Sequence, residues 1–219
     1  MSVNWETHAE REQARYRDGS SRLPDDTDAR QRQLLRIAMA AGGAGLARLM
    51  QGREAEARGW LVRSAERYRE SYADAPTGSW GRLIGVLKAR ILAGDWEGAR
   101  RDAEWVLDQR PADSGSAIGR YAAALAAHVL GDDDGARRLA ASLGADPDAF
   151  PPAVAAALAA LAQHDAAAYA DAVALVLRSF EERDAYLEDV PVADTVLALE
   201  ALAERRGVAA RPRSPLLPV

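Results

Sequence analysis

Hydrophobic side chains recur at intervals of three and four residues along most of this 219-residue chain. Between residues 30 and 50 the interval is set by Leu34, Ile37 and Ala41, and it continues through residues 54–73. Because an α-helix has about 3.6 residues per turn, this spacing gathers apolar side chains on one helix face, whereas a strand needs strict alternation. The pattern predicts an all-α protein of about 8–10 helices.

Turn signals separate the predicted helices. Glycine is favoured just after the last residue of a helix, and proline is tolerated in a first turn but not in a helix interior. The signals along the chain are the segment 74–81, Gly94, Pro111, Gly131, the segment 163–165, Pro191 and Gly207. They divide the chain into helices that follow one another through short turns.

One stretch of the sequence occurs twice. The segment LAGDWEGARR returns 37 residues later as VLGDDDGARR. In each copy a glycine, Gly94 or Gly131, ends one helix, because glycine adopts the left-handed backbone found at helix ends. The next residue, Asp95 or Asp132, can accept backbone hydrogen bonds at the start of the following helix. Asp165 follows Asp132 by 33 residues, so the chain contains a repeated helical hairpin.

The repeat resembles the tetratricopeptide family, whose helix–turn–helix units have a period of about 34 residues. Ala99 and Pro111 lie 12 residues apart, as the small residue of the second helix and the closing proline do in that family. Ala136 and Pro147 nearly match this spacing, and Ala124 lies 12 residues before Ala136. Over about 100 residues, the resemblance implies stacked antiparallel helical hairpins that form a tetratricopeptide-like α-solenoid.

The resemblance also implies where a partner binds, because the first helix of each pair lines the concave face of such solenoids. The residues expected on that face are Ile84, Lys88, Tyr121, Leu125 and His128. Trp80 and Arg82 join them because tryptophan and arginine are enriched at interaction hot spots. Lys88 either meets a carboxylate of the partner, extends to solvent, or pairs with Asp95 or Asp102.

The chain divides into three predicted parts. Residues 1–29 are a polar segment rich in aspartate and arginine, and the sequence leaves open whether they are ordered. Residues 30–207 are expected to form a single all-helical repeat domain. Residues 208–219 contain three prolines and are expected to form an extended tail.

Composition excludes several classes of function. The chain has 28 Lys and Arg against 33 Asp and Glu, and this net charge of -5 provides no basic surface for nucleic acid. It has no cysteine, which excludes disulfides and thiolate chemistry. A charged N-terminus and the lack of an apolar run of about 18 residues predict a cytoplasmic protein that does not interact with membranes. The oligomeric state stays open.

No catalytic constellation is present in the sequence. His8, His128 and His164 are far apart and lack metal-ligand spacing to carboxylates. The glycine-rich segment 41–45 lacks the strand and the Lys-Ser/Thr pair of a phosphate-binding loop. The sequence therefore predicts no catalytic residue, no cofactor and no metal, and indicates a protein that is not an enzyme.

One acidic stretch supports an alternative. Residues 181–189 contain Glu181, Glu182, Asp184, Glu188 and Asp189. Paired carboxylates can act in general acid–base chemistry, so an enzyme or a small-ligand binder using this stretch is the alternative function. The same residues can instead form the solvated end of one helix and the acidic start of the next.

The C-terminal third ends in a predicted helix and a tail with a short motif, made of Leu202, Ala203, Arg206, Gly207, Ser214, Leu217 and Pro218. With this motif the chain resembles the immunity protein 49 family of bacterial polymorphic-toxin systems. In that family an all-helical domain ends in a helix with Leu-Ala and Arg-Gly, followed by a tail with serine and Leu-Pro. The resemblance implies binding to a cognate toxin without catalysis. The sequence thus predicts a protein-interaction scaffold with a protein partner, and a toxin is the specific partner that this family implies.

Overall fold

The computed structural model describes residues 3–186 and 190–218, and their regular structure is helical throughout. The ten α-helices in these ranges confirm the all-α prediction. They are α1 (Trp5–Ser21), α2 (Thr27–Met50), α3 (Glu54–Ala73), α4 (Trp80–Leu92), α5 (Trp96–Asp108), α6 (Ala117–Leu130), α7 (Asp133–Gly144), α8 (Pro152–Gln163), α9 (Ala166–Glu181) and α10 (Asp194–Arg206), with a 3-10 helix, η1 (Pro111–Ser114). No helix within the described ranges is long and apolar enough to span a lipid bilayer.

The helices belong to two compact units. Unit 1 contains residues 1–95, 184–192 and 215–219, and unit 2 contains residues 96–183 and 193–214. The chain therefore passes from one unit to the other after Asp95, Arg183, Val192 and Ser214. The first copy of the repeated segment spans the first of these crossings.

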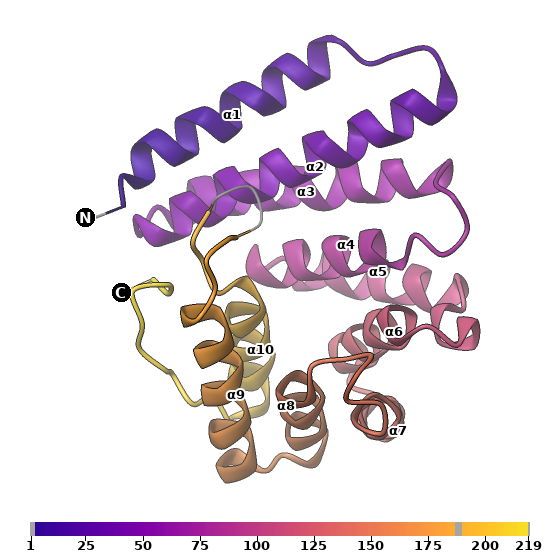
Figure 1. The fold of residues 1–219 in the computed structure, drawn as a ribbon, viewed down its shortest axis with the longest axis vertical. Helices are drawn as coiled ribbons and strands as arrows, with labels where there is room; N and C mark the ends of the chain where they lie inside the picture. Colours follow the sequence, from indigo (N-terminus) through magenta and orange to yellow (C-terminus); the bar gives the residue numbers. More distant parts are fainter. Residues whose placement is uncertain (1–2, 187–189, 219) are drawn as a thin grey trace. The chain divides into compact units, whose positions relative to one another are not determined.

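In unit 1, α1 packs on α2, α2 on α3 and α3 on α4, each next to its neighbour in the sequence (Figure 1). Glycines permit the closest approaches. A Cβ atom on Gly45 would lie 2.6 Å from Leu61 Cγ, and one on Gly85 would lie 2.7 Å from the ring of Tyr68. The absence of a side chain at these two positions therefore sets the spacing of α2 from α3 and of α3 from α4.

The polar helix α1 lies within the segment predicted to be polar, residues 1–29. Its first turn is held by Glu6, which accepts a 2.6 Å hydrogen bond from the buried Arg48 near the end of α2. Hydrogen bonds from Arg48 and Gln51 lower the pKa of Glu6 to about 2. Farther along α1, the fully buried Glu12 pairs with Arg11 at 2.8 Å and Arg15 at 2.9 Å. Charge pairing therefore supplements the small apolar face of this helix.

In unit 2 the packing is again sequential, from α5 through η1, α6, α7 and α8 to α9, and α10 packs on α8 and α9. Small side chains fill most of the contacts. Ala99 and Ala103 of α5 and Ala136 and Ala140 of α7 are all buried, as the repeat predicted for its small residues. Large side chains such as Tyr169 fill the space between more distant helices.

The turns of the repeat have the predicted local structure. Gly94 and Gly131 adopt left-handed backbone, with φ of 63° and 78°. The Asp132 carboxylate accepts a 2.9 Å hydrogen bond from the backbone N–H of Gly135. In the third turn Asp165 caps α9, but the left-handed position before it is occupied by His164, with φ of 54°. Histidine is less stable than glycine in this left-handed conformation, so the His164 side chain is a candidate for a specific role.

Gly119 provides a test of the close packing in unit 2. A Cβ atom at this position would lie 2.2 Å from the backbone oxygen of Pro111, which cannot move aside as a flexible side chain can. We expect Gly119→Ala to lower the free energy of unfolding by about 1–3 kcal/mol in urea denaturation. Gly81→Ala is the control, since a Cβ there would have open space. If the two variants were equally stable, the contact would not constrain the fold.

Candidate functional site

The residues predicted to bind a partner fall into two groups. Trp80, Arg82, Ile84 and Lys88 lie on α4 in unit 1, and Tyr121, Leu125 and His128 lie on α6 in unit 2. On α4, three of the four are half-buried, and Trp80 lies with its ring centroid 6.5 Å from that of Tyr72. The fourth, Arg82, is buried.

Arg82 connects three helices inside unit 1. Its guanidinium donates hydrogen bonds to the backbone oxygen of Ser71 in α3 and to the Gln31 side-chain oxygen in α2. Gln31 in turn donates a 2.8 Å hydrogen bond to Asp28. Burial lowers the pKa of Arg82, although a guanidinium keeps its charge at neutral pH. The geometry gives Arg82 a structural role, and its predicted contact with a partner stays a prediction.

Replacement of Arg82 tests that structural role. In Arg82→Met the buried oxygens of Ser71 and Gln31 lose their donor, so we expect the free energy of unfolding to fall by roughly 2–4 kcal/mol. Arg36→Met, at an exposed position of α2, is the matched control and should change stability little. Chemical denaturation of both variants measures the difference. Equal effects would mean that Arg82 contributes no more than a surface arginine.

The α6 residues differ from the exposed face that the sequence predicted. Tyr121, Leu125 and His128 are 8%, 0% and 2% exposed. Helix α10 approaches α6 at both ends, because Arg206 donates a 2.9 Å hydrogen bond to the His128 backbone oxygen and the Asp194 charge acts on Tyr121. Periodicity placed these side chains on one face but could not show that the same chain covers it.

Tyr121 and His128 bring polar atoms into this buried face. The Tyr121 hydroxyl has no hydrogen-bond partner among the described residues. The His128 ring interacts with the backbone of Leu158, which acts to raise its pKa. Burial, and to a lesser extent the Asp194 charge, raises the pKa of Tyr121. Burial and the nearby Arg206 guanidinium lower the pKa of His128 to about 3, so the imidazole is neutral in the folded protein at neutral pH.

The buried His128 makes stability depend on pH. Below its ordinary pKa of 6.5 the unfolded chain binds a proton here that the folded chain excludes, so stability falls as pH drops from 6.5 toward 3. We expect a loss of about 1 kcal/mol per pH unit from this group. Denaturation between pH 7 and 5 avoids the titration of the carboxylates. The slope should be shallower in His128→Leu, and an unchanged slope would contradict the assignment.

A polar cluster connects adjacent turns of unit 2. Asp133, the first residue of α7, lies 3.0 Å from Nε2 of His164, in the α8–α9 turn. Its other oxygen accepts a 3.2 Å hydrogen bond from Arg206. Burial acts to raise the pKa of Asp133, but the His164 and Arg206 hydrogen bonds outweigh it and lower the pKa. The contact with Asp133 gives the His164 side chain a role that glycine could not fill at this left-handed position. Through this contact, the cluster holds neighbouring hairpins together.

The described residues contain no group of three or more His, Asp or Glu side chains arranged to hold a metal ion. Of the acidic stretch 181–189, Glu181, Glu182 and Asp184 are exposed, and Glu181 accepts a 2.7 Å hydrogen bond from Ser214. Glu188 and Asp189 lie outside the described residues. The described carboxylates therefore have the exposure of solvated surface groups.

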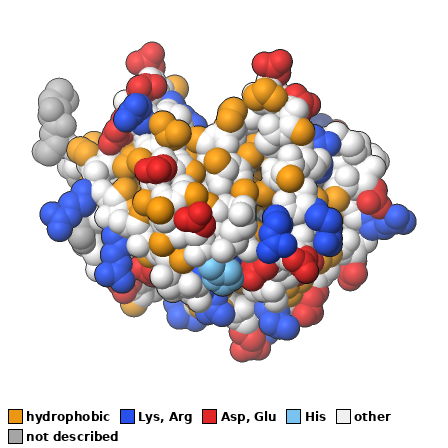
Figure 2. Space-filling view, turned by 90° about the horizontal axis from the view of Figure 1, so that it is seen from below, with side chains coloured by type: hydrophobic (Ala, Val, Ile, Leu, Met, Phe, Trp, Pro, Cys, Tyr) orange, Lys and Arg blue, Asp and Glu red, His pale blue; other side chains and the backbone are white. Residues whose placement is uncertain are grey.

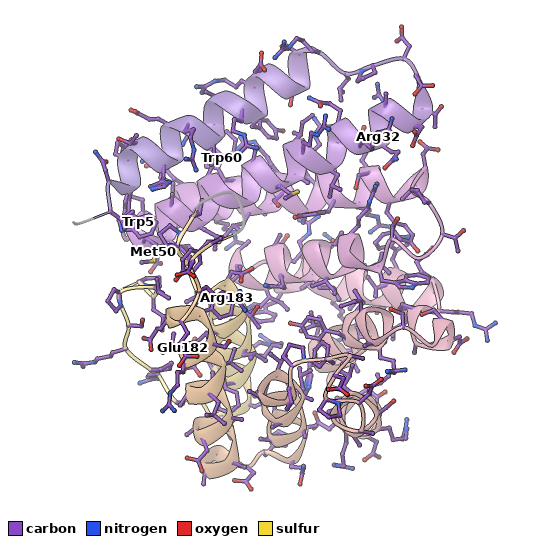
Figure 3. All side chains as sticks on the ribbon, in the orientation of Figure 1. Trp5, Arg32, Met50, Trp60, Glu182 and Arg183 are labelled. Carbon is purple, nitrogen blue, oxygen red and sulfur yellow. The ribbon has the colours of Figure 1, made fainter. Side chains whose placement is uncertain are left out.

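The most distinctive exposed chemistry lies on unit 1, across α1 and α3. The rings of Tyr16 and Trp60 meet edge to face, with centroids 5.3 Å apart, and the Arg63 guanidinium lies 4.9 Å from the Trp60 ring centre. Figure 3 labels Trp60, whose side chain lies on the side of α3 that faces α1. Arg67 hydrogen-bonds to Tyr16 and forms an ion pair with Glu70. We name Tyr16, Trp60 and Arg63 the α1/α3 aromatic surface.

Sequence reasoning assigned Trp60 to the apolar stripe of its helix and did not identify this surface. The side chain is half-buried, because α1 covers only one edge of the ring. The spacing of Trp60 and Arg63, three residues apart on one helix, was the only local signal. The contribution of Tyr16, 44 residues earlier, depends on the packing of α1 against α2.

No family model, no curated protein and no solved structure matches this chain.

Proposed function

We propose that this protein is a non-enzymatic interaction scaffold that binds a protein partner through the α1/α3 aromatic surface. The observation that supports it is the cluster of Tyr16, Trp60 and Arg63, all accessible to solvent. Tryptophan, tyrosine and arginine are the residues most enriched at interaction hot spots, because they combine large apolar area with polar groups. On the molecular face that Figure 2 shows, charged side chains of both signs lie among hydrophobic ones.

The chemistry of the surface indicates a partner that presents a carboxylate beside an apolar side chain. Arg63 is exposed, and its guanidinium lies over the Trp60 ring without forming an ion pair in the described residues. A carboxylate of the partner can bind the guanidinium while an apolar side chain packs on the indole. Arg67 is already paired with Glu70 and would position Tyr16 rather than bind the partner.

The finer architecture in this proposal is a tetratricopeptide-like α-solenoid. Its support is the sequential packing of α6, α7, α8 and α9, together with a left-handed residue and an aspartate cap at both the α6–α7 and the α8–α9 turn. Such scaffolds present rigid surfaces to protein partners and carry no chemistry of their own.

Immunity against a cognate toxin, in the cytoplasm, is the specific version of this function. The C-terminal resemblance supports it, and several of its residues have clear structural roles. Arg206 connects α10 to α6 and α7, Gly207 ends α10 with φ of 72°, and Ser214 binds Glu181. A toxin neutralised by binding would require no catalytic group on this chain.

The experiment is a quantitative pull-down from lysate of the source cell, followed by mass spectrometry and titration of the captured protein. We expect a partner that binds the native chain at least about tenfold more tightly than Arg63→Glu or the Trp60→Ser, Arg63→Glu double variant. Arg138→Glu, an exposed charge reversal on α7, is the matched control and should bind normally. Circular dichroism verifies that each variant is folded.

Two results would contradict the proposal. One is equal binding of the partner by the native chain and both α1/α3 variants. The other is equal loss of binding in the control, which would indicate a general charge effect. If the captured protein is a toxin, its co-expression with the native chain should restore growth, whereas the double variant should not.

A further inference from the structure

The outward face of α9 has an arrangement that the proposed function does not use. Its exposed side chains include Ala167, Asp171, Ala174, Leu175 and Arg178, spaced so that they form one stripe along the helix. Leu175 is 52% exposed, the most of any large hydrophobic side chain in the described ranges. The opposite face of α9 is buried within unit 2, so the helix has a second, smaller apolar feature on its solvent side.

The two charges of this stripe have no partner within the described part of the chain. Asp171 and Arg178 form neither a salt bridge nor a hydrogen bond through their side chains, and they lie two helical turns apart, too far to pair with each other. Several other charges on the surface of unit 2 do pair, such as Arg137 with Asp134 and Arg101 with Glu97. The stripe therefore presents one free charge of each sign on either side of an exposed leucine.

The positions of these residues are symmetric. Asp171 lies three residues before Ala174, and Arg178 lies three residues after Leu175. Both pairs are therefore centred on the peptide bond between Ala174 and Leu175. A two-fold axis through this point, perpendicular to the helix, would exchange the members of each pair. An antiparallel copy of α9 would thus place Asp171 opposite Arg178 of the second copy, and Leu175 opposite the small Ala174.

We propose that α9 is a self-association surface whose partner is a second copy of this chain, docked antiparallel with α9 against α9. The charges select the orientation, because a parallel pair would bring Asp171 against Asp171 and Arg178 against Arg178. The small side chain of Ala174, opposite Leu175 of the second copy, lets the two helices approach closely. A contact of one helix pair is small, so the dimer is weak, with a dissociation constant on the order of micromolar or higher.

Sedimentation velocity of the full chain between micromolar and millimolar concentration tests this dimer. The native chain should sediment increasingly as a dimer. Asp171→Arg and Arg178→Asp, made separately, should each weaken the dimer about three- to thirtyfold, because two pairs are lost and like charges face each other. The combined swap, Asp171→Arg with Arg178→Asp, should restore most of the native affinity. Leu175→Ser should also weaken association.

The control is Arg100→Glu, a charge reversal at an exposed position of α5, which should leave the dimer unchanged. A native chain that stays monomeric at millimolar concentration would overturn the proposal. So would a dimer insensitive to Asp171→Arg and Leu175→Ser, since it would form through another surface. Loss in both single variants without recovery in the swap would overturn the antiparallel pairing. All substitutions lie on unit 2, so the result is independent of the α1/α3 aromatic surface.

Discussion

The close approach of neighbouring helices through alanine and glycine is the constraint on which the rest of the structure depends. Gly45 accommodates Leu61, Gly85 accommodates the ring of Tyr68, and Gly119 lies against the backbone of Pro111. Contacts of this kind have high packing density, but each small side chain buries little apolar area. Stability is therefore spread over many modest contacts, to which fully buried large side chains such as Leu83 and Leu158 add.

Buried polar groups supply connections that small side chains cannot. Arg82 bridges α2 and α3 from α4, and Arg206 connects α10 to α6 and α7. Glu200 accepts a 2.7 Å hydrogen bond from Tyr169 of α9 and also accepts from the backbone of Arg211, which holds the start of the tail against α10. A buried polar group that loses its partner destabilises the fold, so these hydrogen bonds specify which helices pack together.

The two proposed binding surfaces have a common origin in the small side chains that pack between the helices. Helices with small inward side chains leave aromatic and charged residues on their outer sides, as at Trp60 and Arg63 on α3 and at Leu175 and Arg178 on α9. The first surface combines aromatic area with arginine and suits a different protein, whereas the second has paired opposite charges and suits a copy of itself. Because the surfaces lie on different units, one does not require the other.

Local sequence determined the helices, their turns and their caps, because these depend on side-chain periodicity and on residues a few positions apart. Gly131 and Asp132 are predicted correctly, and so is the cap at Asp165. Tertiary structure decided exposure. It buried Arg82 and His128, left Trp60 half-exposed and joined His164 to Asp133. A helical period shows which side chains share a face, but what covers that face depends on residues far away in the chain.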